Sequence, residues 1–428
     1  MREIHLRPPR GWINDPNGFI YYKGEYHLFY QHFPYAPRWG RMHWGHAVSR
    51  NLTDWKHLDI ALFPTKTDDC DGCFSGSAVE KDGKMHILYT GVRYDTPDPE
   101  NTNCCIDDKF TAAQLHISSE DGYTFDNFNG KKTAIPPLSD PNIGDRNHTR
   151  DPKIWKGNDG NYYAVLGSTA HGKGRLLFYR SKDLLDWEFV NYASTDGLGW
   201  MWECPDLFKV GDEYVLIFSP MGTELGNQAF CGKVTFDEKT CSMNTDGNFA
   251  LLDIGKDLYA PQSTVDRDGR RTVIAWLRMP KPAKNGTIGM FCTPRVCEIK
   301  NGHICFTPHP DVRNLFTKKV SEPNKGAYML KATLDEGERL SVGGYDLEMK
   351  NRRLTADRSA VIGKNTELET RFETPELPAA AELEIFVDEN MIEVFVNGGE
   401  YVITNTVYGL SDKIIGNAEI FIPCKTEE

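Results

Sequence analysis

Short runs of apolar and aromatic residues, separated by turn residues, make up much of this chain. Such runs occupy residues 19–22, 26–30, 86–89, 162–166, 214–218 and 272–276. Short runs bounded by Gly, Asp, Asn or Pro are typical of strands, and helical periodicity is scarce. Several runs follow a turn pair such as Lys23-Gly24 or Asp82-Gly83, which indicates hairpins. The pattern therefore predicts an all-β protein.

A weak internal repeat organises the first part of this pattern. The segment Ser49-Arg50-Asn51-Leu52-Thr53-Asp54-Trp55 returns as Ser181-Lys182-Asp183-Leu184-Leu185-Asp186-Trp187, and residues 118–125 look like a degenerate copy midway between them. The implied unit of about 66 residues fits a four-stranded propeller blade with long loops, so that about 300 residues make five blades. A β-sandwich with chance similarity between loops is the alternative.

The character of the chain changes after residues 308–315. The remainder contains no Trp and carries alternating apolar and polar segments such as 383–387 and 392–396. Alternation over many short runs indicates two packed antiparallel sheets. We therefore divide the chain into a five-bladed β-propeller over residues 1–308 and a short C-terminal β-sandwich over residues 309–428, which packs against the propeller.

Composition narrows the classes of function. A length of 428 residues suffices for two domains, and 39% hydrophobic with 11% aromatic residues suits a soluble β-rich protein with a ring-lined cleft. The net charge of −12, without a basic run, argues against nucleic acid as a partner. No apolar stretch approaches the roughly 18 residues that a membrane span needs, and none follows Arg2 as in a secretory precursor.

The cysteines bear on the cellular compartment. There are eleven, an odd number at irregular spacings, which indicates reduced thiols and predicts a cytoplasmic location. Cys70 and Cys73 could form half of a zinc site with Cys104 and Cys105. Adjacent cysteines seldom chelate one tetrahedral ion, however, so the sequence leaves the role of these four open.

Three acidic residues lie in unusually rich contexts: Asp15 in Trp12-Ile13-Asn14-Asp15-Pro16-Asn17-Gly18, Asp151 in Arg150-Asp151-Pro152, and Glu203 in Trp202-Glu203-Cys204-Pro205. The first is a turn in which Pro fixes φ and Asn and Asp bond to their own backbone, so it would hold a carboxylate still. An Asp-Pro pair alone indicates only a turn, since it also occurs at Asp98 and Asp140. The evidence is the joint occurrence of the three segments.

These segments, in this order, resemble glycoside hydrolase family 32, the family of invertases and fructan hydrolases. Segments 29–31, 44–49, 74–79, 259–263, 275–276 and 294–295 share the resemblance, with a fainter echo over residues 386–398. The resemblance implies a five-bladed propeller followed by a sandwich, with no metal or organic cofactor. It implies a retaining hydrolase that releases terminal β-D-fructofuranosyl residues from sucrose and fructo-oligosaccharides.

The resemblance also implies the roles of the acids. Asp15 is the nucleophile that forms a covalent fructosyl-enzyme, Glu203 is the general acid and then the base, and Asp151 stabilises the transition state. In a retaining enzyme the two reacting carboxyl groups lie about 5–5.5 Å apart, and one must arrive protonated. From sequence proximity we expect Arg150 to keep Asp151 charged, and Trp202 to give Glu203 an apolar wall.

Nine further residues match family positions that contact or line the sugar site, whereas His46 is interpreted as a structural hydrogen-bonding residue. The nine are Asn14, Gln31, Trp39, Trp44, Phe74, Ser75, Arg150, Tyr259 and Trp276.

Several alternatives stay open at this point. A sucrose-6-phosphate hydrolase would need an anion site, to which five loop cations could contribute if they are not simply surface charge: Lys173, Arg175, Arg278, Lys281 and Lys284. A fructan (inulin or levan) exo-hydrolase and a fructosyl transferase share the same catalytic residues. An inverting arabinan- or xylan-type hydrolase would also use two aspartates and a glutamate. A non-catalytic sugar-binding propeller belongs to a different class.

Overall fold

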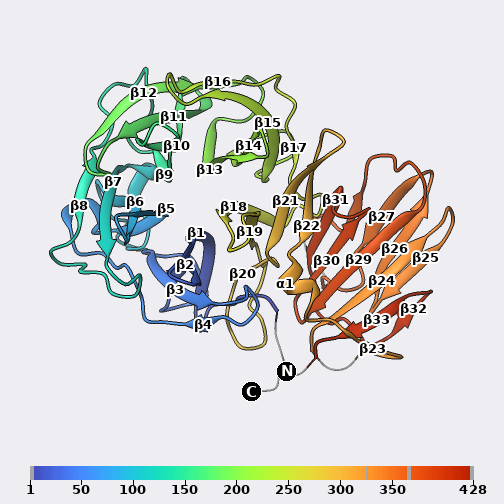
Figure 1. Cartoon of the computed structure of the whole chain (residues 1–428). Coiled ribbons are helices and arrows are strands. Elements are labelled where there is room, and N and C mark those ends of the chain that lie inside the picture. Colours follow the sequence, from blue (N-terminus) through green and yellow to red (C-terminus); the bar gives the residue numbers. More distant parts are fainter. Residues whose placement is uncertain (1–3, 324–325, 364–367, 425–428) are drawn as a thin grey trace.

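The computed structural model describes residues 4–323, 326–363 and 368–424. In these residues five sheets surround a common axis as a five-bladed β-propeller, and two further sheets form a β-sandwich beside it (Figure 1). The all-β prediction, with five blades and a C-terminal sandwich, is confirmed.

The strands of each blade pair antiparallel in chain order. Blade I contains β1 (Trp12–Tyr22), β2 (Glu25–Phe33), β3 (His43–Ser49) and β4 (Lys56–His57). Blade II contains β5 (Gly72–Lys81), β6 (Lys84–Tyr94), β7 (Phe110–Ser119) and β8 (Lys132–Ile135), with short 3₁₀ turns at Thr67–Asp69 and Ile106–Asp108. Blade III contains β9 (Arg150–Lys156), β10 (Tyr162–Ala170), β11 (Lys173–Ser181) and β12 (Trp187–Ala193).

The last two blades carry extra short strands. Blade IV contains β13 (Met201–Val210), β14 (Glu213–Met221), β15 (Phe230–Asp237), β16 (Ser242–Asn244) and β17 (Ala250–Leu251). Blade V contains β18 (Leu258–Val265), β19 (Arg271–Leu277), β20 (Met290–Phe291), β21 (Arg295–Lys300) and β22 (His303–Pro308). The first strand of each blade lies nearest the axis and contacts the first strand of the next blade (Figure 1).

The sequence repeat corresponds to one turn that recurs between the third and fourth strands of blades I, II and III. Side-chain oxygens of Asn51, Asp121 and Asp183 each accept hydrogen bonds from the backbone N–H groups two and three residues further on. The indoles of Trp55 and Trp187 each donate to the carbonyl three residues earlier, at 3.0 Å. The repeat therefore reflects the same hydrogen-bonded turn at equivalent places in three successive blades.

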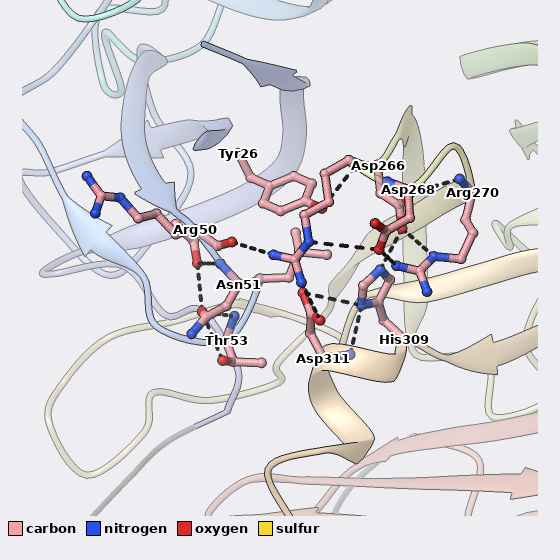
Figure 2. A network of polar contacts seen from close by, with 12 residues as sticks. Tyr26, Arg50, Asn51, Thr53, Asp266, Asp268, Arg270, His309 and Asp311 are labelled. Atoms are coloured by element: carbon pink, nitrogen blue, oxygen red, sulfur yellow. Dashed lines mark hydrogen bonds and ion pairs between the residues drawn. The ribbon is translucent and has the colours of Figure 1, made fainter. Parts of the chain in front are cut away.

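The propeller closes between blade I and blade V. The backbone N–H of Ile13 donates to the carbonyl of Ile288 at 3.0 Å, so the chain entering β1 adds to the last blade. At the opposite end of the strands of these two blades lies the polar network of Figure 2, in which Asp266 contacts His309 at 2.9 Å at the start of helix α1 (Pro310–Arg313). Arg267 joins the blades by donating to the carbonyl of Arg50 at 2.7 Å.

The sandwich consists of a six-stranded and a five-stranded sheet with one apolar core between them. The first has the order β23 (Lys318–Val320), β33 (Glu419–Ile422), β24 (Tyr328–Leu334), β29 (Ala381–Asp388), β30 (Met391–Val396) and β31 (Tyr401–Thr406). The second has the order β28 (Arg371–Glu373), β27 (Arg353–Asp357), β26 (Tyr345–Lys350), β25 (Arg339–Val342) and β32 (Ile414–Ile415). The alternating segments 383–387 and 392–396 lie within β29 and β30.

A buried ionic cluster joins the propeller to the sandwich. Arg295 of blade V contacts Asp253 at 2.9 Å and Glu393 of β30 at 2.8 Å. Glu393 also contacts His5 at 2.9 Å, and His5 contacts Asp388 at 3.0 Å. All five side chains are buried. Buried charges persist only when they are paired, so this cluster requires both domains to be in place.

His5 makes the interface pH-dependent. Although burial favours its neutral form, hydrogen bonds to Asp388 and Glu393 raise the pKa of His5 to about 9. A histidine pKa raised on folding adds stability that is complete below the unfolded value of about 6.5 and is lost as the pH rises through about 9. We expect the Tm difference between wild type and His5→Gln, followed by circular dichroism, to be largest below about pH 6.5 and to shrink toward pH 9. The exposed His171→Gln serves as control, and a difference that stays constant with pH contradicts this expectation.

Candidate active site

The innermost strands are irregular at one end of the propeller axis. Register shifts interrupt β1, β5, β9, β13 and β18 at this end. Asp151, Cys204 and Ala260 adopt positive φ values of 61°, 47° and 50°, which non-glycine residues seldom do. Bulges and left-handed residues re-aim side chains, and they are concentrated at functional sites. Here they turn side chains of five strands toward one point.

A cavity of about 480 Å³ lies at that point. It is lined by eleven of the twelve residues that the sequence predicts for the site: Asn14, Asp15, Gln31, Trp39, Phe74, Ser75, Arg150, Asp151, Glu203, Tyr259 and Trp276. The three acids come from the first strands of blades I, III and IV. Asp15 and Asp151 are more than a hundred residues apart along the chain.

Trp44 is the exception, and its prediction as a sugar contact is wrong. It lies in β3, away from the axis, and is fully buried in a core that joins blades I and II. Its ring packs against Phe29 and Tyr89, and its indole N–H donates to the carbonyl of Phe74 at 3.0 Å. Trp44 therefore supports the strand that carries Phe74 and Ser75.

Asp15 is held by donors on both carboxyl oxygens. Asn14 donates to Oδ1 at 3.1 Å, and Trp12 fixes the orientation of that amide by donating to its oxygen at 2.8 Å. Ser75 donates to Oδ2 at 2.5 Å. Burial raises the pKa of Asp15, and the charge of Glu203 raises it further, while the bonds from Ser75 and Asn14 oppose the rise. Asp15 is thus fixed in place with little solvent.

Glu203 has a different set of partners. Arg150 donates to Oε1 from Nη2 at 2.7 Å and from Nε at 3.2 Å. The hydroxyl of Tyr259 donates to Oε2 at 2.6 Å and also lies 3.1 Å from the carbonyl oxygen of Ser219. Because Tyr259 has a second acceptor within reach, its single proton can turn to Ser219 when Glu203 is itself protonated. The geometry accommodates both protonation states of this carboxyl group.

Of two expectations about neighbours in the sequence, one holds in part and one is wrong. The charge of Arg150 favours the ionised form of Asp151, as expected, but the two side chains approach only to 3.9 Å, and the carboxylate that accepts hydrogen bonds from Arg150 is that of Glu203. Trp202 is fully buried and packs on Phe218 in a core of blades III and IV, away from the cavity. Consecutive residues of a strand point to opposite faces, so Trp202 and Glu203 cannot share one side.

Asp151 is held by two hydrogen bonds whose donors are backbone N–H groups. Its own N–H donates to the hydroxyl of Thr90, and its Oδ2 accepts the N–H of Cys204, both at 3.0 Å. Burial raises the pKa of Asp151 to about 7; the charge of Arg150 opposes the rise, and Glu203 and Asp15 add to it. The Asp151 carboxyl group can therefore hold a proton close to neutral pH.

Eight further residues line the cavity and were not found from the sequence: Tyr94, Cys104, Cys105, Asp108, Phe110, His148, Trp200 and Met221. Of these, His148 stands two residues before Arg150, and Trp200 three before Glu203, which is the signal that could have pointed to them. Cys104 and Cys105 therefore form part of the cavity wall. Cys73 lies apart, buried beside Asp69. Among the described residues no group of three or more His, Cys, Asp or Glu is placed to hold a metal ion.

The five loop cations considered for a phosphate site do not reach the cavity. Each has another partner: Lys173 with Asp196, Arg175 with the carbonyls of Asn142 and Ile143, Arg278 with the carbonyl of Asn227, Lys281 over the ring of Tyr408, and Lys284 with Glu389. Arg150 is the one Lys or Arg side chain in the cavity lining, within the part of the chain that the structure describes. These five cations are surface or structural charges.

Comparison with known proteins gives consistent matches over nearly the whole chain. The model of the glycosyl hydrolases family 32 N-terminal domain matches residues 5–308, and that of the family 32 C terminal matches residues 327–421. A raffinose invertase of Escherichia coli is 34% identical over 446 residues, covering 96% of this chain and 90% of the relative. A sucrose-6-phosphate hydrolase of Escherichia coli is 35% identical over 444 residues, covering 95% and 88%.

Solved structures agree with these matches. A family 32 β-fructofuranosidase of Bombyx mori superposes with a TM-score of 0.83 at 30% identity, covering 99% of this chain and 94% of that chain. A sucrose-6-phosphate hydrolase from Lactobacillus gasseri gives a TM-score of 0.86 at 26% identity, covering 99% and 93%. In the described residues, no helix is both long and apolar enough to span a membrane.

Proposed function

The chain belongs to glycosyl hydrolase family 32 and is a glycosidase that releases fructosyl units, and from that premise we propose how its own residues divide the reaction. The observation that carries the proposal is the convergence of Asp15, Asp151 and Glu203 on one cavity, each with different hydrogen-bond partners. Two carboxyl groups of unlike environment flanking the scissile bond are the usual solution for glycoside cleavage.

In the first step, the Asp15 carboxylate attacks the anomeric carbon of a terminal β-fructofuranosyl unit, and Glu203 gives its proton to the departing oxygen. A fructosyl–Asp15 ester and a free leaving sugar result. In the second step Glu203, now ionised and paired with Arg150, takes a proton from water, which displaces Asp15 and releases fructose. Asp151 accepts hydrogen bonds from fructose hydroxyls that strengthen in the transition state.

The charge of the cavity supports neutral sugars as substrates. Of the described residues, four acidic side chains line it, namely Asp15, Asp108, Asp151 and Glu203, and the one guanidinium among them is already bonded to Glu203. A phosphate dianion would meet net negative charge without a free cationic partner, which disfavours its binding. We therefore propose sucrose and short fructo-oligosaccharides as substrates in preference to sucrose 6-phosphate.

Rates of fructose release from sucrose, kestose, inulin, levan and sucrose 6-phosphate test both parts of this proposal. We expect kcat/KM for sucrose to exceed that for its 6-phosphate by at least about tenfold, because of charge repulsion in a low-dielectric cavity. A faster 6-phosphate reaction contradicts the substrate assignment alone. Sugar binding without release from any substrate contradicts the fructosidase and favours a non-catalytic propeller.

We also propose a cellular location and a division of the chain into folding units. A cytoplasmic location is consistent with eleven free thiols, because secreted proteins of this cysteine content usually form disulfides. A division into folding units at residues 1–308 and 309–428 is consistent with the end of β22 at Pro308 and with the start of the sandwich strands at β23.

A further inference from the structure

His148 lies in the wall of the cavity, and only 17% of its side chain is exposed. Its Nδ1 is 3.0 Å from Nη1 of Arg150. A guanidinium has only donors, so Nδ1 must accept this hydrogen bond and cannot carry a proton. The ring proton therefore resides on Nε2, and the imidazole is neutral.

The surroundings of the ring fix this state and its orientation. The planes of Trp200 and Phe110 stand nearly perpendicular to the ring, at centroid distances of 5.1 and 5.5 Å. The charged groups that face the ring are Arg150, Asp108, Asp145 and Glu203, and the closest carboxylate oxygen, on Asp108, is 3.6 Å from Nε2. Burial lowers the pKa of His148, and the charge of Arg150 lowers it further.

Arg150 is held by three residues. Its Nε and Nη2 donate to Glu203, Nη2 also lies 3.9 Å from the sulfur of Met221, and Nη1 donates to His148. Without an acceptor at His148, a buried Nη1–H group loses its partner, which costs free energy unless the guanidinium moves. Asp151 offers an alternative, since its Oδ2 is only 3.9 Å from Nε. Loss of the imidazole acceptor therefore favours movement of Arg150 from Glu203 toward Asp151.

We propose that His148 is a positioning residue whose neutral imidazole holds Arg150 against Glu203, and so keeps the charged partner of the acid/base in place. The proposal rests on the proposed role of Glu203. His148 acts through Arg150 and needs no contact with the substrate.

The proposal has a consequence for the two reaction steps. The second step needs Glu203 as an ionised base, and Arg150 is its charged hydrogen-bond partner, so a displaced Arg150 should slow this step and lower kcat. The ratio kcat/KM reports only the steps up to cleavage of the glycosidic bond, so kcat should fall more than kcat/KM, whereas damage to sugar binding would raise KM instead.

Two variants separate this role from a merely structural one. His148→Leu keeps much of the volume and removes the acceptor, whereas His148→Asn places an amide oxygen near the position of Nδ1. With sucrose as substrate, His148→Leu should lower kcat by about tenfold and kcat/KM by less than about threefold, so that KM falls. His148→Asn should restore both close to wild type, and the exposed His171→Leu should change neither.

An unchanged kcat or a raised KM in His148→Leu overturns the proposal, as does a His148→Asn variant that behaves like His148→Leu. His148→Ala replaces the leucine variant if the latter does not fold, as judged by circular dichroism. These outcomes require an active wild type. A wild type that releases no fructose overturns the proposed function itself and this proposal with it, so the two failures are distinguishable.

Discussion

Replacing Asp15 with alanine should lower kcat for sucrose by on the order of 10⁴-fold, because it removes the carboxylate that forms the ester with fructose. Ser75 and Asn14 hold this carboxylate in the cavity, but neither can replace it as nucleophile. Folding should be unaffected. Burial raises the pKa of Asp15, so the ionised side chain is disfavoured in the folded state, and its removal should leave Tm equal or higher.

The matched control is Asp140→Ala, which alters another Asp-Pro pair on an exposed loop. It should retain full activity. Fructose release measured for wild type and both variants decides the matter: an Asp15→Ala enzyme within about tenfold of wild type contradicts the assignment of the nucleophile.

The second large effect is expected for Glu203→Gln. The amide cannot give a proton to the leaving sugar, so kcat/KM for sucrose should fall by about 10²- to 10⁴-fold. Its oxygen can still accept from Arg150, which limits the structural change. β-D-fructofuranosyl fluoride should be attacked normally, because fluoride leaves without protonation. The reaction should then stall at the fructosyl-enzyme and give a burst.

Azide distinguishes the acid/base from the nucleophile. It needs no general base, so it should restore turnover of the fluoride by Glu203→Gln and produce fructosyl azide. Asp15→Ala should react with neither the fluoride nor azide. The exposed Glu224→Gln is the control for Glu203→Gln. Equal losses on sucrose and the fluoride, with no effect of azide, contradict the assignment of Glu203.

Local features of the fold were predictable from the sequence. The apolar runs became strands, and the turn chemistry around Asn51 and Asp183 recurs in equivalent places. Such features depend on residues close in the chain, so one sequence is enough to predict them. Most of the residues that the motifs around the acids predict for the site do line one cavity.

Predictions about partners failed where tertiary structure decides them. Arg150 adjoins Asp151 in the sequence, yet the left-handed backbone at Asp151 turns that carboxylate away, and Arg150 reaches Glu203 of another blade. Trp39 and Trp44 are similar in sequence context, but only Trp39 lines the cavity, because β3 packs its tryptophan into the core between blades.

Residues in long loops were missed for the same reason. Cys104, Cys105 and Asp108 belong to the loop between β6 and β7 of blade II, and no local pattern says that this loop folds over the cavity. His148 and Trp200 precede the innermost strands of blades III and IV, and they meet only when those blades pack side by side.

The most direct test of a covalent fructosyl–Asp15 intermediate is the stereochemistry of transfer to methanol. Wild-type enzyme is incubated with sucrose and methanol, and the methyl fructofuranoside is identified by NMR, which avoids the anomeric interconversion of free fructose. Two successive displacements, first by Asp15 and then by methanol, predict methyl β-D-fructofuranoside. Methyl α-D-fructofuranoside would indicate a single displacement and would contradict Asp15 as the nucleophile.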